Sequence, residues 1–270
     1  MITAEMTLPG MTAPGMTAWA LLIEYDGAPF VGWQKQKTGV SVQEVLETAA
    51  AKLNGGHPVP SVAAGRTDSG VHAEGQVVRL LLPAHYLANK IRDALNYHMR
   101  PHKVVVLSVA PAPEGWSPRF SAIERAYRYR ILNRPARPTL TLDKVWHVHR
   151  PLDAVAMQDA GNVLLGTHDF TSFRATACQA KSPIRTIDRL EVSRAYDHIE
   201  VIVEARSFLH HQVRNIVGTL KLVGEGVWTA ADVASALAAR RRSAAGPTAP
   251  ADGLTLTRVA YPAEPGLVFD

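Results

Sequence analysis

The spacing of hydrophobic residues predicts a chain of two similar halves, each built from strands and helices. Apolar residues fill or alternate along the expected strands and recur every three or four positions along the expected helices. In the first half the expected strands are 19–26, 59–64, 76–82 and 103–110, with helices after Ser41 and around Ile91. The order β-α-β-β-α-β is that of the split unit found in ferredoxin-like folds.

The second half shows the same mixture of strand-like and helix-like spacing of hydrophobic residues. Its expected strands are 124–132, 184–194, 199–205 and 254–259, and its expected helices are 155–164, 209–223 and 233–240. Pro111 and Pro113 interrupt the pattern between the halves, so we place the domain junction there. The prediction is an N-terminal α/β domain over 18–113 and a C-terminal one over 114–270, after a flexible leader of residues 1–17.

Together these elements predict an α/β fold of the α+β kind. Two ferredoxin-like halves would form a mostly antiparallel central sheet with flanking helices and a basic active-site cleft between them. Two helix starts are marked by capping boxes, Ser41 with Glu44 and Thr229 with Asp232.

Composition narrows the class of protein. Of 270 residues, 47% are hydrophobic and 20% are charged, which is ordinary for a globular chain and excludes a disordered one. No apolar run approaches the roughly 20 residues of a membrane span. The lone Cys178 cannot form an internal disulfide or a cysteine-rich zinc site, and it fits a reducing, cytoplasmic location.

Charge points to a polyanionic partner. The chain carries a formal net charge of +5, and residues 116–150 contain eight basic residues against two acidic ones. The basic residues are Arg119, Arg125, Arg128, Arg130, Arg134, Arg137, Lys144 and Arg150. Tyr127 and Tyr129 stand among them, and arginines interleaved with aromatics favour a nucleic acid over a generic solvated surface.

The densest motif is Gly65-Arg66-Thr67-Asp68-Ser69-Gly70-Val71-His72-Ala73. Asp68 in this glycine-flanked loop is either an ordinary turn residue or a carboxylate that serves as a nucleophile or general base. Its Asp-Ser-Gly core also matches aspartic proteases, but these need a second carboxylate, and the chain has no second Asp-Ser-Gly or Asp-Thr-Gly.

A second group of polar residues lies in the expected helix 209–223. Arg214 stands among Val213, Ile216 and Val217, so its guanidinium should be partly buried and needs an anion, either Asp68 or another acid such as Glu204. Adjacent His210 and His211 would point about 100° apart on a helix. With no carboxylate nearby in the sequence, we predict no metal site.

The segment 125–130 alternates arginine with tyrosine. In a strand, Tyr127 and Tyr129 would share one face, and Arg128 and Arg130 the other. The aromatic face could stack on a base while the arginines meet phosphate, or the tyrosines could be ordinary core residues. The chain has no Walker A, Gly-x-Gly-x-x-Gly or Gly-x-Ser-x-Gly motif, so usual signals for nucleotide-dependent and serine-hydrolase chemistry are missing.

Taken in order, these motifs resemble the tRNA pseudouridine synthases of the TruA type over about residues 19–262. The segments that carry the resemblance are 24–27, 32–34, 64–73, 119–122, 127–129, 168–173, 210–218 and 253–256. The sequence departs from the family at Pro118, where Ala is usual, at Gln212, where Met is common, and in the leader.

The resemblance implies isomerisation of uridine to pseudouridine in the anticodon stem-loop of tRNA, at positions 38, 39 and 40. It places the catalytic aspartate at Asp68, its partner at Arg214, the active-site tyrosine at Tyr127 and the base-extruding arginine at Arg66. Arg119, Arg128 and His72 are further candidates for substrate binding. No cofactor, metal or membrane is implied, the partner is tRNA, and the family works as homodimers.

Two other classes stay open at this point. A non-catalytic RNA-binding module would be expected to lose Asp68 or Arg214, and both are present. An aspartic hydrolase lacks its second acid.

Overall fold

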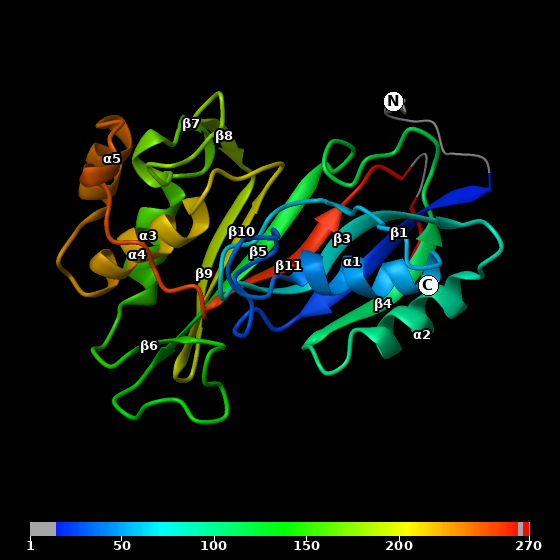
Figure 1. The fold of residues 1–270 in the computed structure, drawn as a ribbon. Helices are drawn as coiled ribbons and strands as arrows, with labels where there is room; N and C mark the ends of the chain where they lie inside the picture. The colour runs from blue at the N-terminus through cyan, green and yellow to red at the C-terminus, as the bar shows by residue number, and fades with distance from the viewer. Residues whose placement is uncertain (1–14, 264–266, 270) are drawn as a thin grey trace. The chain divides into compact units, whose positions relative to one another are not determined.

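The computed structural model describes residues 15–263 and 267–269, and the chain forms two compact units (Figure 1). Unit 1 comprises the chain up to Thr67, Ala73–Ile123 and the segment from Val259 onward. Unit 2 comprises Asp68–His72 and Glu124–Arg258. The short loop 68–72 therefore belongs to unit 2, although the residues on both sides of it belong to unit 1.

Unit 1 has the predicted element order. Its elements are β1 (Met16–Tyr25), α1 (Val42–Leu53), β2 (Val62–Ala63), β3 (His72–Pro83), α2 (Ala88–His98) and β4 (Val104–Pro111). β1 pairs antiparallel with both β3 and β4, β2 pairs with β3, and α1 and α2 pack side by side.

β1 begins earlier than its hydrophobic pattern suggests. Met16 and Thr17, assigned to the leader from the sequence, pair with Pro83 and Leu82 of β3. Residues 1–14 of that leader lie outside the described part of the chain. In α1 the predicted cap is present, because the Ser41 hydroxyl accepts a hydrogen bond from the Glu44 amide at 3.2 Å.

Unit 2 is built around mostly antiparallel strands. Its strands are β5 (Glu124–Asn133), β6 (Trp146–Val148), β7 (Gly166–Asp169), β8 (Ile184–Ile187), β9 (Arg189–Ala195), β10 (His198–Ala205) and β11 (Leu254–Ala260). Its helices are α3 (Ala154–Asn162), α4 (Gln212–Gly224) and α5 (Ala230–Ala238), with 3₁₀ turns at Thr171–Phe173 and Arg242–Ala244.

The strands of unit 2 lie in the order β11-β5-β10-β9, β6 runs parallel to β5, and β7 and β8 form a separate pair. Helices α3, α4 and α5 gather beside β9 and β10 in Figure 1. They close a core that contains Tyr129, Phe170, Ile216 and Leu220, all fully buried. The predicted α+β fold, a mostly antiparallel sheet with flanking helices, is confirmed.

Two elements differ from their predicted bounds for identifiable reasons. The strand expected over 184–194 is split at Asp188, because β8 pairs with β7 whereas β9 pairs with β10. The helix expected over 209–223 begins at Gln212, because His211 adopts a left-handed conformation with φ of 62°. The short β7 was not predicted. In the described part of the chain no helix is long and apolar enough to cross a membrane.

Candidate active site

An ion pair joins the two most distinctive motifs of the sequence. Arg214 Nη1 donates to Asp68 Oδ2 at 3.0 Å, although 146 positions separate the two residues. The Arg214 side chain is 15% exposed and that of Asp68 is 24% exposed. The predicted pair is confirmed, while the other candidate acid, Glu204, accepts instead from Arg189.

The ion pair lies within one compact unit, because Asp68 and Arg214 both belong to unit 2. The bond therefore attaches the loop 68–72 to the start of α4. A partly buried guanidinium gains from this contact because its charge would otherwise be poorly solvated.

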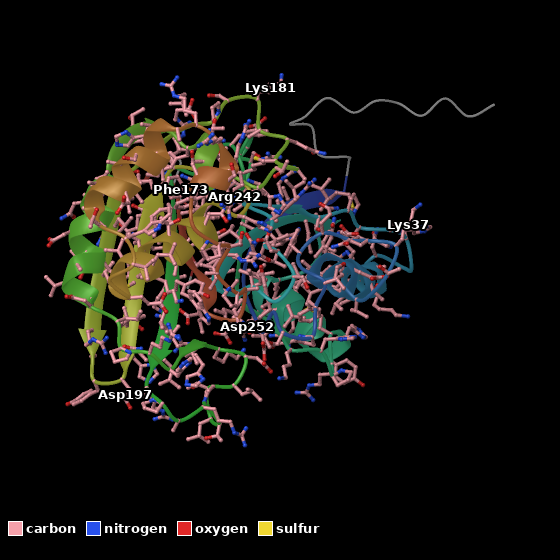
Figure 2. All side chains as sticks on the ribbon, turned by 90° about the vertical axis from the view of Figure 1, so that its left-hand side faces the viewer. Lys37, Phe173, Lys181, Asp197, Arg242 and Asp252 are labelled. Carbon is pink, nitrogen blue, oxygen red and sulfur yellow. The ribbon has the colours of Figure 1, made fainter. Side chains whose placement is uncertain are left out.

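The orientation of Arg214 is set by the chain segment 245–252. Arg214 Nε donates to the Ala249 carbonyl at 2.8 Å, and the Ala249 amide donates back to the Arg214 carbonyl at 3.1 Å. Arg242 holds the same segment, since its guanidinium donates to the Ala245 and Gly246 carbonyls and to Asn215 Oδ1. Asn215 in turn donates to the carbonyl of Phe173, which is labelled with Arg242 in Figure 2.

Gly218 allows this segment to lie directly on α4. A Cβ atom at position 218 would stand 1.8 Å from the Pro247 carbonyl oxygen. Gly218→Ala is therefore expected to lower the free energy of unfolding by about 1–3 kcal/mol, the usual cost of overpacking. Gly65→Ala is the matched control, because a Cβ there meets no atom within 4 Å. Chemical denaturation of both variants checks this, and equal stabilities would contradict it.

His210 and His211 approach the same carboxylate. His210 Nε2 lies 3.3 Å from Asp68 Oδ1, and His211 Nε2 lies 3.2 Å from Asp68 Oδ2. Because both histidines precede α4, the angle expected from a helix does not apply, and their ring centroids are 4.1 Å apart. The argument that no carboxylate lies nearby was wrong. Burial lowers the pKa of His211, which the Asp68 charge opposes and His210, Arg214 and Arg242 reinforce.

The two tyrosines of β5 have different surroundings. Tyr129 is completely buried, its hydroxyl donates to the Pro250 carbonyl at 2.8 Å, and burial raises its pKa far above the usual range. It is therefore a core residue that supports the segment 245–252. Tyr127 is partly exposed and packs edge-to-face on Phe208, with ring centroids 5.3 Å apart. Tyr127 thus remains accessible beside the segment that carries His210 and His211.

The other predicted binding residues are divided between the two units. His72 is only 5% exposed, with Nε2 3.2 Å from the Asp252 carbonyl oxygen and Nδ1 3.2 Å from Lys144 Nζ. Arg128 lies in β5 with Nε 3.9 Å from Glu200 Oε1. Arg66 and Arg119 are exposed residues of unit 1, and the Arg119 guanidinium lies 5.7 Å from the Phe120 ring centroid.

Tyr25 and Trp33 both form hydrogen bonds with Thr67. The Tyr25 hydroxyl hydrogen-bonds to Thr67 Oγ1 at 2.8 Å, and the Trp33 amide donates to the Thr67 carbonyl at 3.0 Å. Burial raises the pKa of Tyr25 to about 12, so it stays protonated. These contacts within unit 1 hold the residue immediately before Asp68. In the sequence, segments 24–27 and 32–34 contributed only to the family resemblance, so this role was missed.

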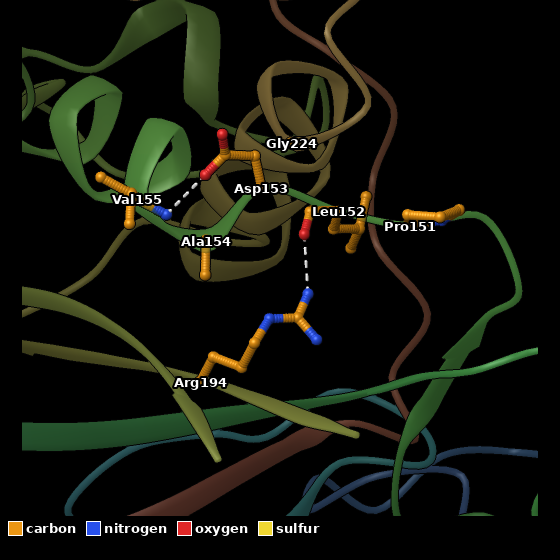
Figure 3. Close-up of a pocket in the computed structure, with 7 residues that line it drawn as sticks. All are labelled: Pro151, Leu152, Asp153, Ala154, Val155, Arg194 and Gly224. Carbon is orange, nitrogen blue, oxygen red and sulfur yellow. Dashed lines mark hydrogen bonds between the residues drawn. The ribbon is translucent and has the colours of Figure 1, made fainter. Parts of the chain in front are cut away.

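A pocket in unit 2 does not involve these residues (Figure 3). It is lined by Pro151, Leu152, Asp153, Ala154, Val155, Arg194 and Gly224. Its one cation, Arg194, donates to the Leu152 carbonyl and to Asn133 Oδ1, both at 2.7 Å. Asp153 caps α3 through the Val155 amide. Because these charged groups bind the protein itself, the pocket is a weaker candidate than the Asp68 site.

Comparison with known proteins agrees with the motif-based interpretation. The family model described as tRNA pseudouridine synthase matches residues 21–121 and 160–262. A protein named tRNA pseudouridine synthase A from Acidiphilium cryptum is 64% identical over 248 residues, which cover 92% of this chain and 97% of that protein. Its namesake from Gluconobacter oxydans is 55% identical over 249 residues, covering 92% and 90% of the two chains.

The family match includes Asp68 and Arg214, the two residues that the structure joins. It also includes His210 and His211, and it leaves out 122–159, where Tyr127 and Arg128 lie. Similarity on this scale covers nearly the whole chain. The chain therefore belongs to the tRNA pseudouridine synthase family, and it is an isomerase that acts on uridine in tRNA.

Proposed function

We propose that Asp68 is the catalytic group with which this chain converts uridine to pseudouridine in the anticodon stem-loop of tRNA, at positions 38, 39 and 40. The observation that carries this proposal is the ion pair with Arg214, which holds a carboxylate that is still partly exposed. A single ionised, oriented and accessible carboxylate is what an attack on a sugar carbon or a proton abstraction requires.

The reaction needs no other reagent. The N-glycosidic bond of the uridine breaks, the uracil turns, and a carbon–carbon bond forms to the same sugar, so reactant and product have the same composition. Asp68 either attacks C1′ or removes the proton at C2′. Both routes need an oriented carboxylate, and the Arg214 guanidinium at 3.0 Å holds it in place. We propose no cofactor and no metal as a participant in the reaction.

The target base must leave its stack before Asp68 can reach the sugar. Unstacking costs a few kcal/mol, which the protein has to supply through its contacts with the base and the backbone. We assign stacking on the flipped base to Tyr127, because its ring is partly exposed beside the segment 208–211. We assign occupation of the vacated space to Arg66, and phosphate contacts to Arg119 and Arg128.

His72 has a different role in this proposal. Its ring is buried and both of its nitrogens are engaged by Asp252 and Lys144. These contacts support a positioning role, in which His72 anchors the end of the loop that carries Asp68, over one of direct contact with tRNA.

The direct test is formation of pseudouridine. The protein is incubated with a tRNA transcript that has uridine at positions 38 to 40, and the nucleosides are analysed by nuclease digestion and chromatography. A transcript with cytidine at those positions is the control. Product in both transcripts would overturn the proposed position, and product in neither would overturn the proposed substrate.

Binding of tRNA should weaken steeply with salt. Each phosphate contact that releases a counterion adds about 0.7 to 0.9 to the slope of log affinity against log salt. We expect the dissociation constant to rise at least about tenfold between roughly 50 and 200 mM salt. Arg119→Gln should reduce the slope, whereas Arg92→Gln, a cation paired with Asp93 outside the basic segment, should not. Filter binding at several salt concentrations checks this, and a flat dependence would argue against phosphate contacts.

We also propose a homodimer, a cytoplasmic location and domains over 18–113 and 114–270. The solitary Cys178 supports the location, and the resemblance to the family supports the dimer. Sedimentation equilibrium of the purified chain tests the oligomeric state.

A further inference from the structure

The side chains around Asp68 suit a second ligand besides the ribose of the substrate. We propose that Asp68, His210 and His211 form a binding site for a zinc-type divalent cation, which blocks the catalytic carboxylate when it is occupied. The blocking rests on the function proposed above for Asp68, whereas the cation site rests on the geometry alone.

The distances match those of a metal site. One ligand atom from each residue can be chosen so that all three lie within 4.8 Å of one another. His210 Nε2 lies 3.3 Å from Asp68 Oδ1, whereas His211 Nε2 lies 3.2 Å from the other carboxylate oxygen, Oδ2. Ligands at about 2.0–2.1 Å from a tetrahedral zinc ion are separated from one another by about 3.3 Å. A cation can therefore enter with small movements of the side chains.

The donor set selects the kind of cation. Two imidazole nitrogens and one carboxylate leave a fourth position open, as in zinc sites with three protein ligands. Imidazole suits zinc, cobalt and nickel, whereas magnesium and calcium prefer oxygen ligands. Among the described residues this is the one group of three such side chains whose ligand atoms come so close.

The histidines are held in place and can be reached from solvent. His211 lies in a left-handed conformation, with φ of 62°, directly before α4, and this bend brings its ring beside that of His210. The exposed fractions of the His210 and His211 side chains are 44% and 28%. An incoming cation therefore displaces water and needs no opening of the core.

The positive charges of Arg214 and Arg242 both lower the pKa of His211. Arg214 donates to Asp68 Oδ2, which leaves Oδ1 for the metal, and a ligating carboxylate is commonly held by such an outer hydrogen bond. The two positive charges also oppose binding. The site is thus suited to a cation that binds reversibly and inhibits, and not to a permanent structural zinc ion.

Occupation of the site would stop the reaction. A lone pair of Asp68 that coordinates a metal can neither attack C1′ nor accept the proton from C2′. The histidines would release any proton on their Nε2 atoms to solvent as the cation binds.

The site is tested on the free protein, without tRNA. Zinc is titrated calorimetrically, and cobalt(II) is followed by its visible absorption, into the wild type, His210→Gln and His211→Asn. Asn is chosen at position 211 because it tolerates the left-handed backbone. We expect one ion per chain in the wild type and a dissociation constant at least tenfold higher in both variants. His149→Gln, which removes an exposed histidine elsewhere in unit 2, should bind like the wild type.

Turnover is then measured across the same range of zinc concentrations, with magnesium as the comparison. We expect inhibition by zinc near its dissociation constant, reversal by a chelator and no inhibition by magnesium. Zinc affinity that is unchanged in both histidine variants would overturn the site and leave the proposed function untouched. Histidine-dependent zinc binding with undiminished turnover would instead overturn the blocking, whereas the catalytic role of Asp68 is tested separately by the Asp68→Asn variant.

Discussion

Asp68→Asn is expected to reduce kcat by at least about a thousandfold, the scale seen when a catalytic nucleophile or base is removed. The amide keeps the size of the side chain but carries no negative charge, so it can neither attack C1′ nor take the proton from C2′. The affinity for tRNA should change little, because most of the binding free energy of such complexes comes from phosphate contacts.

Single-turnover assays with excess enzyme and filter binding at fixed salt measure the two quantities separately. The variant must also be shown to fold, since Asp68 contacts Arg214, and its unfolding curve serves as that control. Substantial pseudouridine formation by a folded Asp68→Asn variant would remove Asp68 from the mechanism. A large loss of tRNA affinity would mean that the carboxylate serves binding.

Arg214→Lys is expected to lower kcat by about tenfold to a hundredfold and to change KM much less. Lysine keeps the positive charge, but its ammonium cannot reproduce the planar guanidinium that bonds to Asp68 through Nη1 and to the Ala249 carbonyl through Nε. Losing one charge-assisted hydrogen bond costs about 1.5–3 kcal/mol, which corresponds to this range of rates.

Arg189→Lys is a matched control. Arg189 also pairs with an acid of unit 2, but this acid is Glu204 on the neighbouring strand β10 and not Asp68. It should retain nearly full activity, as expected for an exposed ion pair. If Arg214→Lys is as active as the wild type, the guanidinium does not orient the carboxylate. If kcat is unchanged and KM rises, Arg214 contacts the substrate instead.

The local elements of this fold could be predicted because their signals lie within a few residues. Ser41 caps α1 through the Glu44 amide, and Thr229 and Asp232 form a complete capping box at α5. Hydrophobic periodicity and helix capping depend on residues close together in the sequence, so they can be recognised without knowledge of the tertiary structure. Where a partner strand decided the outcome, as in the split at Asp188, the pattern alone was insufficient.

The candidate site could be predicted only in part from the sequence. The burial of Arg214 among apolar residues required a nearby acid, but choosing Asp68 over Glu204 required the resemblance to a family. The contacts made by Ala249, Pro250 and Asp252 run through backbone carbonyls, which carry no side-chain signal. Likewise, nothing local distinguished the buried Tyr129 from the more accessible Tyr127 two positions earlier.

By itself the sequence determined the alternation of strands and helices, the basic character of residues 116–150 and the chemical groups available for catalysis. Only the tertiary structure decided which groups meet. It assigned the loop 68–72 to unit 2, and it brought His210 and His211 to Asp68 through a bend before α4. The physical reason is distance along the chain: a contact between residues 146 positions apart depends on the packing of everything between them.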